Sequence, residues 1–263
     1  MIRYASAALA AVGLSALWLT PGAAQGQKDA WGTIKGQLVY GGPVVPQQKP
    51  LKINKDESHC LAKGPILDPE WIVNKENKGV KNVFVWLAPD PNGPTKTLPI
   101  HPSLQAVPKE PHVIDQPQCM FEPYASVMRE GQEVIVKNSA PVNHNIRWTG
   151  DPEVNPGGNV TLPPSKEYLI KDLKAQTLPL LLQCNIHPWM SGRLAVYDHP
   201  YFAVTDKDGN FEIKLAPAGN FRVFIWHDGA GWRLAEKGSQ GEPIAVKAGQ
   251  TTDLGKLPIQ EVK

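Results

Sequence analysis

The chain has 263 residues and a formal net charge of +2, which is enough length for one large domain or two small ones. Its 26 prolines and 23 glycines are hostile to long helices and typical of many short strands joined by turns. Because the charge is nearly balanced and no basic run occurs, the composition gives no case for nucleic-acid binding.

The first 24 residues predict the cellular compartment. A short positive start at Arg3 leads into an apolar run from Tyr4 to Leu19, and small residues follow up to Ala24. This pattern is typical of a cleaved signal peptide over residues 1–24, whereas a membrane anchor needs about 20 apolar residues. No later segment of the sequence has the composition of a bilayer span. We therefore expect a mature protein that is periplasmic or secreted and has no membrane span.

The three cysteines become informative once export is expected. An oxidising compartment favours disulfides, and an odd number of cysteines leaves one for other chemistry. Cys184 has a histidine and a methionine close by, so Cys60 and Cys119 are left to pair. The alternative is a pair of buried free thiols. The expected disulfide closes a long loop and restricts the unfolded chain by roughly 4 kcal/mol.

Strands are predicted along the whole chain. Before residue 111 they are few, and a loop with one helical turn is expected at 95–111. From residue 111 they come at short, regular spacing, as in a sandwich or barrel. The expected strands are 31–40, 68–73, 80–87, 112–114, 126–128, 133–137, 144–148, 159–162, 168–170, 178–182, 192–197, 202–205, 211–215, 221–227, 243–247 and 253–258.

The stretch that carries chemistry lies between two of these strands. Cys184, His187 and Met190 supply a thiolate, an imidazole and a thioether, each three positions from the next. Copper prefers such ligands over the oxygen ligands of magnesium or calcium. Zinc competes for the cysteine and the histidine, but methionine is a poor zinc ligand. The remaining alternative is a core cysteine beside an unrelated histidine and methionine.

A second imidazole completes the expected site. His144 follows a proline-bearing turn and lies forty positions before Cys184, which is far enough for the strands between them to fold back. Two histidines and one thiolate in a plane, with a long axial methionine, describe a blue-copper centre that exchanges one electron.

The residues around these ligands resemble the cupredoxin family of type 1 blue copper proteins. The Cys184-x-x-His187-Pro-Trp-Met190 loop is similar to ligand loops of the amicyanin and plastocyanin type, and the upstream Pro141-x-x-His144-Asn145 segment resembles the one that carries the first histidine ligand. The resemblance covers residues 112–197 and implies a Greek-key β-sandwich that binds one copper ion through these four ligands. It also implies that Asn145 forms hydrogen bonds near the cysteine sulfur and ties the two ligand loops together.

The two ends of the chain resemble another family. Asp206-Lys-Asp-Gly-Asn-Phe211, followed by Pro217-x-Gly-Asn-Phe221, is similar to turns of the carboxypeptidase regulatory-like, transthyretin-like β-sandwich, and residues 31–42 resemble its first strand. We therefore expect an all-β chain in which strands from both ends form a second, smaller β-sandwich. The predicted boundaries are 31–110 for the N-terminal β segment, 111–197 for the cupredoxin domain and 198–263 for the C-terminal β segment.

The neighbours of the expected ligands argue against an enzyme. Gln183 and Asn185 flank Cys184, so the histidines that link a mononuclear to a trinuclear copper centre are missing, and the single cysteine cannot form a binuclear centre. The remaining histidines are scattered, and we expect them to be ordinary surface or hydrogen-bonded residues: His59, His101, His112, His199 and His227.

The sequence therefore predicts an exported copper protein that carries single electrons between redox partners such as a cytochrome c or a dehydrogenase. Pro188 and Trp189 flank His187, so we expect a partner to dock there and electrons to leave through the edge of the His187 ring. The alternatives are a copper chaperone or storage module, and a structural cell-surface β-domain with a vestigial site.

Overall fold

The computed structural model describes residues 30–234 and 238–261, and the expected signal peptide lies outside them. Within these residues the helical structure is limited to α1 (Glu57–Cys60) and the two 3₁₀ turns η2 (Pro102–Leu104) and η3 (Gly238–Gln240). No helix in this part of the chain is long and apolar enough to cross a membrane. The one expected helical turn, at 95–111, is η2. The all-β fold class predicted from the sequence is confirmed.

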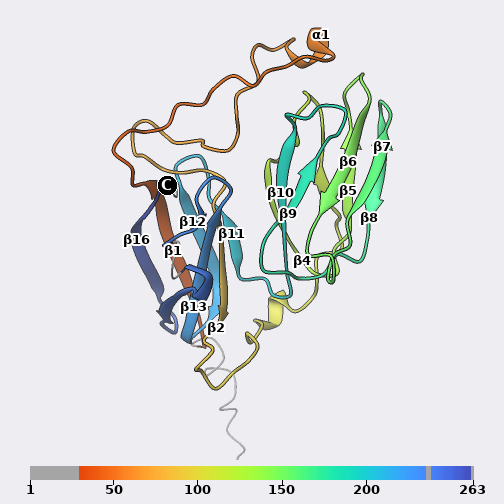
Figure 1. The fold of residues 1–263 in the computed structure, drawn as a ribbon. Coiled ribbons are helices and arrows are strands. Elements are labelled where there is room, and N and C mark those ends of the chain that lie inside the picture. Colours follow the sequence, from red (N-terminus) through yellow and green to blue (C-terminus); the bar gives the residue numbers. More distant parts are fainter. Residues whose placement is uncertain (1–29, 235–237, 262–263) are drawn as a thin grey trace, which may run out of the picture.

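Two β-sandwiches lie side by side (Figure 1). The first, which we call the flanking sandwich, takes strands from both ends of the chain, in the sheets β12-β1-β16 and β11-β2-β13-β14, with β15 paired to β13. Its strands are β1 (Trp31–Tyr40), β2 (Phe84–Pro89), β11 (Phe202–Val204), β12 (Asn210–Pro217), β13 (Gly219–His227), β14 (Gly231–Trp232), β15 (Glu242–Val246) and β16 (Thr251–Ile259). Whether it belongs to the regulatory-like family stays a prediction.

The second, or central, sandwich is built from the middle of the chain. Its sheets have the orders β4-β10-β9-β6-β7 and β3-β5-β8. Its strands are β3 (His112–Ile114), β4 (Ala125–Arg129), β5 (Val134–Asn138), β6 (His144–Thr149), β7 (Gly158–Leu162), β8 (Lys166–Ile170), β9 (Leu180–Gln183) and β10 (Ser191–Tyr197). With eight strands among the described residues, it has as many as the flanking sandwich.

Alternation of apolar and polar residues explains how these strands pack. In β5, Val134, Val136 and Asn138 are buried while the residues between them are half-buried, because successive side chains of a strand point to opposite faces. Strand β13 shows the same period in the flanking sandwich, where Phe221, Val223 and Ile225 point into the core. The sequence pattern thus decides which face of each sheet is buried.

The segment between β1 and β2 leaves the flanking sandwich and returns to it. It runs across to one end of the central sandwich, where it carries α1 (Figure 1). Within it, residues 51–66 form a closed loop, because the backbone N–H of Leu51 donates to the Ile66 carbonyl over 2.8 Å. Cys60 and Ile66 are buried in the core of the central sandwich. We call residues 51–66 the cover loop.

A disulfide attaches the cover loop to the central sandwich. Cys60 is bonded to Cys119, which lies 59 positions later in the segment between β3 and β4, and both sulfurs are buried. The disulfide predicted from the sequence is therefore confirmed. Closing a loop of this length removes roughly 4 kcal/mol of chain entropy from the unfolded state.

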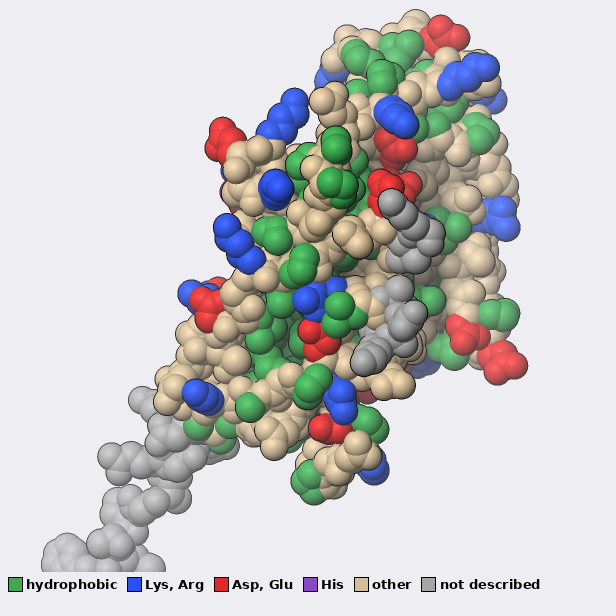
Figure 2. All heavy atoms as spheres, turned by 60° about the vertical axis from the view of Figure 1, so that its left-hand side comes forward, with side chains coloured by type: hydrophobic (Ala, Val, Ile, Leu, Met, Phe, Trp, Pro, Cys, Tyr) green, Lys and Arg blue, Asp and Glu red, His purple; other side chains and the backbone are tan. Residues whose placement is uncertain are grey.

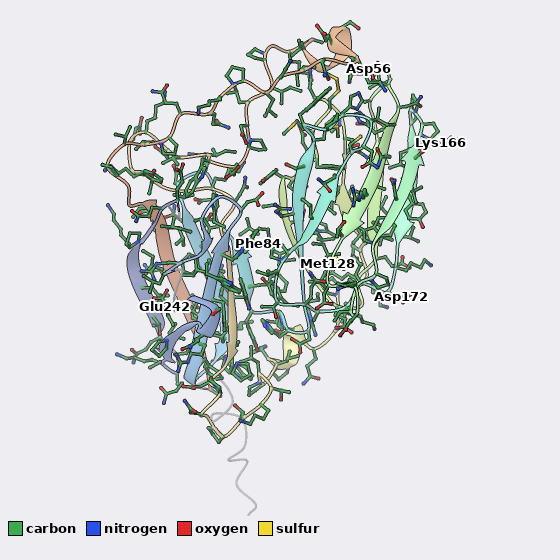
Figure 3. All side chains as sticks on the ribbon, in the orientation of Figure 1. Asp56, Phe84, Met128, Lys166, Asp172 and Glu242 are labelled. Carbon is green, nitrogen blue, oxygen red and sulfur yellow. A yellow bond between two sulfur atoms is a disulfide. The ribbon has the colours of Figure 1, made fainter. Side chains whose placement is uncertain are left out.

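Aromatic side chains fill the layer between the two sandwiches. Phe84 and Trp86 of β2 lie in one cluster with Tyr197 of β10, and Phe84 is among the side chains labelled in Figure 3. The ring of Trp86 is stacked on that of Tyr197, with 5.1 Å between centroids, and on that of Phe224 at 5.4 Å. This shared apolar layer fixes one sandwich against the other.

The outer surface of the flanking sandwich carries mixed charges. Figure 2 turns the left-hand side of Figure 1 forward, and on that face lysines and arginines are interspersed with aspartates and glutamates. The face shows neither a basic nor an acidic field, which agrees with the small net charge of the sequence.

The structure differs from two of the expected strands. Residues 68–73 form no strand, and within them only Val73 takes part in an isolated bridge, with Val80. Strand β2 begins at Phe84 rather than at residue 80, because Asn82 has a positive φ of 65° that interrupts an extended chain. Val80 and Val83 are buried all the same, since they pack into the flanking core.

Candidate metal centre

Two neighbouring strands bring the first two candidate ligands together. His144 is the first residue of β6, and Cys184 directly follows β9. These strands are antiparallel, with Arg147 opposite Gln183, so the start of β6 lies beside the end of β9. The backbone N–H of Asn145 then reaches the Cys184 sulfur over 3.5 Å. Strand pairing therefore brings His144 and Cys184 together across forty positions of sequence.

The turn between β9 and β10 supplies the third candidate ligand. The Met190 N–H donates to the His187 carbonyl over 2.9 Å, and the Cys184 N–H donates to the Met190 carbonyl over 3.3 Å. These bonds fold the loop back on itself, and His187 faces Cys184. His144, Cys184 and His187 form a buried group whose ligand atoms lie within 4.8 Å of one another.

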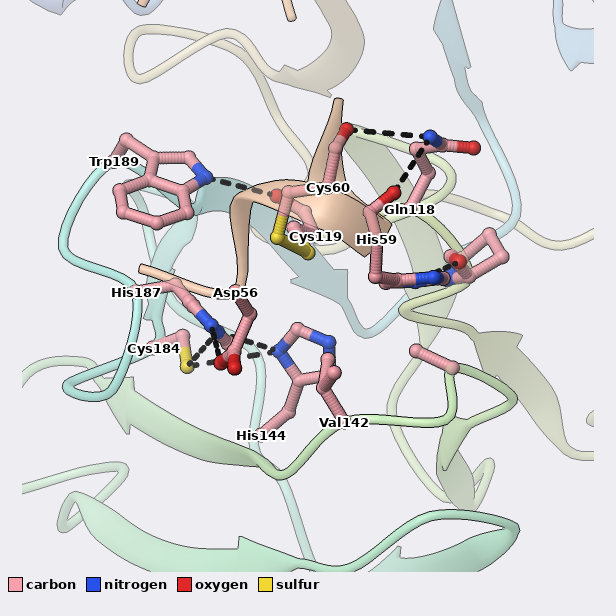
Figure 4. The surroundings of a disulfide bond; sticks show 12 residues. Asp56, His59, Cys60, Gln118, Cys119, Val142, His144, Cys184, His187 and Trp189 are labelled. Carbon is pink, nitrogen blue, oxygen red and sulfur yellow. Dashed lines mark hydrogen bonds and ion pairs between the residues drawn. A yellow bond between two sulfur atoms is a disulfide. The ribbon is translucent and has the colours of Figure 1, made fainter. Parts of the chain in front are cut away.

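The three ligand atoms form an isosceles triangle (Figure 4). The Nδ1 atoms of His144 and His187 are 3.1 Å apart, and each lies 3.9 Å from the Cys184 Sγ. A point in the plane of these atoms and about 2.0–2.1 Å from both nitrogens lies about 2.2–2.3 Å from the sulfur, which are ordinary metal–nitrogen and metal–sulfur bond lengths. These residues would hold one metal ion through two imidazoles and a thiolate.

Met190 lies in the same core as these ligands. Its side chain is 1% exposed and belongs to the hydrophobic cluster that contains Cys184. A buried thioether next to a histidine and cysteine pair is the donor set that favours copper over zinc. The four residues singled out from the sequence are therefore gathered at one end of the central sandwich.

Asn145 connects the two ligand-bearing segments. Its Oδ1 accepts hydrogen bonds from the backbone N–H groups of Asn185 at 2.7 Å and Ile186 at 3.2 Å, and it lies 3.2 Å from the Cys184 sulfur. Its Nδ2 donates to the Asn159 Oδ1 on β7 over 2.7 Å. The side chain thus holds the cysteine loop against β6, and its other end is fixed by β7.

Burial keeps both imidazoles neutral. Desolvation lowers the pKa of His144 to about 4, and the charge of His187 adds to this effect. Desolvation also lowers the pKa of His187, an effect that its hydrogen bond to the Asp56 carboxylate opposes. Neutral imidazoles keep their lone pairs free at neutral pH, which a metal ligand requires.

The structure adds one residue to the site that sequence reasoning missed. The Asp56 Oδ2 of the cover loop lies 2.8 Å from the Nε2 of His187, on the side of the ring away from the ligand triangle. The disulfide is close as well, because both of its sulfurs lie within 4.8 Å of a ring nitrogen of His187. Asp56 and His187 are 131 positions apart, and Asp56 belongs to no recognisable motif, so no sequence signal could have paired them.

The cover loop also buries the ring of His187. The side chain of His187 is 0% exposed, because Asp56 and the disulfide cover its outer edge. That electrons leave through this edge stays a prediction. Pro188 is exposed. Trp189 is half-buried, its ring is 5.0 Å from that of His187, and its Nε1 donates to the Cys119 carbonyl over 3.3 Å. Docking at Pro188 and Trp189 stays a prediction.

The remaining histidines are not part of the ligand triangle. His199 and His227 are buried, and the Nδ1 of each accepts a backbone N–H two residues later, from Tyr201 and Gly229. His59 lies next to Cys60, where its Nε2 is 3.2 Å from the Pro117 carbonyl. These positions agree with the expectation of ordinary hydrogen-bonded histidines.

Comparison with known proteins gives structural likenesses only. No family model matches the sequence, and no curated protein matches it. Among solved structures, the purple cupredoxin from Nitrosopumilus maritimus is similar over 32% of this chain and 98% of its own, with 20% identity and a TM-score of 0.28. An oxidised amicyanin variant is similar over 33% of this chain and 81% of its own, with 22% identity and a TM-score of 0.27. A copper-containing nitrite reductase from Thermus scotoductus SA-01 is similar over 38% of this chain, which spans 25% of the reductase, with 21% identity and a TM-score of 0.31.

Proposed function

We propose that this chain is a type 1 copper protein that carries single electrons through a centre formed by His144, Cys184, His187 and Met190. The observation that supports the proposal most directly is the triangle of two Nδ1 atoms and one Sγ, with sides of 3.1, 3.9 and 3.9 Å. Copper in such a centre changes between its cupric and cuprous states by one electron.

The protein residues prepare this centre before any ion enters. His144 and Cys184 are held by the pairing of β6 and β9, and Asn145 fixes the cysteine loop to β6. The four side chains are 0–2% exposed, so water is excluded from the donor atoms. A site held in one shape by packed strands moves little when its charge changes, which favours fast electron exchange.

Zinc and a role without electron transfer are the alternatives to be tested. A zinc site would use the two histidines and the thiolate, but it gives Met190 no role as a ligand. A copper chaperone has to release its ion to a partner, and the complete burial of both histidines works against such a release. Burial therefore favours the carrier over the chaperone.

The expected compartment and partners follow from the same proposal. A disulfide between Cys60 and Cys119 is typical of proteins outside the reducing cytosol, which supports export of this chain. An exported carrier exchanges electrons with other redox proteins, and we infer a cytochrome c or a dehydrogenase as the partner class. We infer no catalytic activity for the copper centre.

The test is an absorption spectrum of the purified mature protein, loaded with cupric ion. A type 1 centre has an intense blue, green or purple band from charge transfer between thiolate and copper. Cys184→Ser removes the thiolate and should remove the band. His199→Gln is the matched control, because it changes a buried histidine outside the centre and should leave the band in place.

Voltammetry then separates an electron carrier from a passive copper site. The carrier should give a reversible one-electron wave that is absent in Cys184→Ser. A colourless cupric complex without a reversible wave would contradict the proposal, and equal binding of zinc with no thiolate band would favour the zinc alternative.

A further inference from the structure

The two imidazoles of the candidate centre are not equivalent. Each presents Nδ1 to the ligand triangle, so each carries its proton on Nε2 when Nδ1 donates its lone pair to an ion. The His187 Nε2 has a carboxylate partner, Asp56 Oδ2, at 2.8 Å. The His144 Nε2 is buried and has no hydrogen-bond partner among the described residues. Only one of the two ligands is therefore oriented by a charged group.

The backbone around Asp56 is shaped to present this carboxylate. Asp56 precedes α1 as its N-cap residue, yet its side chain makes no capping hydrogen bond. Its φ of 49° and ψ of 34° lie in the left-handed region, which is uncommon for residues other than glycine. An aspartate at an N-cap usually satisfies the first N–H groups of its helix. Here the side chain turns instead toward the ring of His187 (Figure 4).

Bonds of the residues that follow Asp56 keep it in this position. Its own carbonyl accepts the N–H groups of His59 at 3.0 Å and Cys60 at 2.9 Å, and Cys60 is linked to Cys119. Gln118 donates its side-chain amide to the carbonyls of His59 and Cys60, at 3.3 and 3.2 Å. In Figure 3, Asp56 lies beside α1, at the end of the central sandwich from which the ligand loops project. The cover loop is therefore fixed over the centre.

We propose that Asp56 is a positioning residue of the copper centre, whose carboxylate orients His187 and stabilises the cupric state relative to the cuprous state. The inference rests on the proposed function. A carboxylate on the outer nitrogen of a ligand histidine raises the basicity of that ligand, and its negative charge favours the more highly charged ion. The cover loop thereby supplies a charge that neither ligand segment carries.

The test compares Asp56→Asn and Asp56→Ala with a control that removes a nearby charge. Glu57 is the next residue and is exposed, so Glu57→Gln removes the same charge without touching His187. We expect Asp56→Ala to weaken cupric binding about 10- to 100-fold, the usual cost of losing the partner of a ligand histidine, and cuprous binding to a smaller extent. The reduction potential should therefore rise in Asp56→Ala and Asp56→Asn. Glu57→Gln should leave it unchanged.

A measurement on the metal-free protein separates this inference from the proposed function. In ¹⁵N-resolved NMR the His187 Nε2–H should be protected from exchange in the wild type and in Glu57→Gln, and unprotected in Asp56→Ala. If the wild type shows the protected proton but no thiolate band, the proposed function fails, and with it the effect on copper. If the band is present and Asp56→Ala has the wild-type potential and cupric affinity, the inference is wrong. An equal shift in Glu57→Gln would also overturn it, because remote charge alone would then explain the effect.

Discussion

The backbone N–H of Asn145 lies 3.5 Å from the sulfur of Cys184, and the side chain of the same residue binds the loop that follows this cysteine. One residue thus connects the two ligand-bearing segments through its backbone and through its side chain. The geometry of the candidate centre depends on this double contact.

Replacing Asn145 by alanine should loosen the cysteine loop. The N–H groups of Asn185 and Ile186 lose their acceptor, and we expect the metal-free protein to lose about 1–3 kcal/mol of stability in urea unfolding. The affinity for copper should fall about 10- to 100-fold. Asn159→Ser is the control, since it changes only the outer partner of Asn145 and should have the smaller effect on both quantities. Equal effects of the two variants would contradict this role.

Removing the disulfide should destabilise the chain and free the cover loop. The double variant Cys60→Ala with Cys119→Ala should lose roughly 4 kcal/mol in urea unfolding of the metal-free protein, because its unfolded chain is no longer closed over 59 positions. In limited proteolysis the variant should be cleaved within residues 51–66 before the wild type is. Wild-type stability in the double variant would show that the link does not restrict the unfolded chain.

Acid should destabilise the protein through its buried histidines. Burial lowers the pKa of His227 to about 4 in the folded state, while an unfolded histidine titrates near 6.5, so the unfolded chain binds more protons between these values. The free energy of unfolding keeps its full value with respect to His227 above about pH 6.5, and it decreases as the pH falls toward 4. The decrease amounts to about 2 kcal/mol between pH 7.5 and pH 5. His199, whose pKa burial also lowers to about 4, adds to the same slope.

Urea unfolding of the metal-free protein at pH 7.5 and pH 5 measures this slope. His227→Gln should reduce the loss of stability between the two pH values, whatever its effect at pH 7.5. His101→Gln, at a partly exposed position, is the control and should keep the wild-type slope. A slope that does not change in His227→Gln would exclude His227 as its source.

The contact between the sandwiches should matter for stability but not for the metal centre. Trp86 is 5% exposed and stacks on Tyr197, so Trp86→Ala should cost about 3–5 kcal/mol. Tyr197 is six residues along β10 from Ser191, which is about 20 Å of extended chain away from the ligand loop. The copper spectrum and potential of the folded variant should therefore equal those of the wild type. Trp86→Phe, which keeps an aromatic ring, should lose less stability.

Local chemistry explains why much of the candidate centre could be predicted. Cys184, His187 and Met190 lie in one short loop, and the proline turn before His144 has its own pattern, so the four residues could be named without knowledge of the fold. The disulfide followed from an odd number of cysteines, and the structure contains it. The all-β class followed from strands at regular spacing broken by proline and glycine.

Elements without a local pattern could not be predicted. The segment 68–73 was expected to be a strand on composition, but it lies in the long connection between β1 and β2, where only Val73 takes part in an isolated bridge. Helix α1 has four residues, too few for a hydrophobic period, and no element was predicted there.

The sequence by itself determined the donor atoms, because ligand chemistry depends on residue type and the spacing within a loop is local. Only the tertiary structure decided what surrounds them. Asp56 is 131 positions from His187 and meets it because the cover loop crosses from the flanking to the central sandwich and is bonded there through Cys60. The His187 ring is buried for the same reason, because the Asp56 carboxylate and the disulfide that cover it come from distant parts of the sequence.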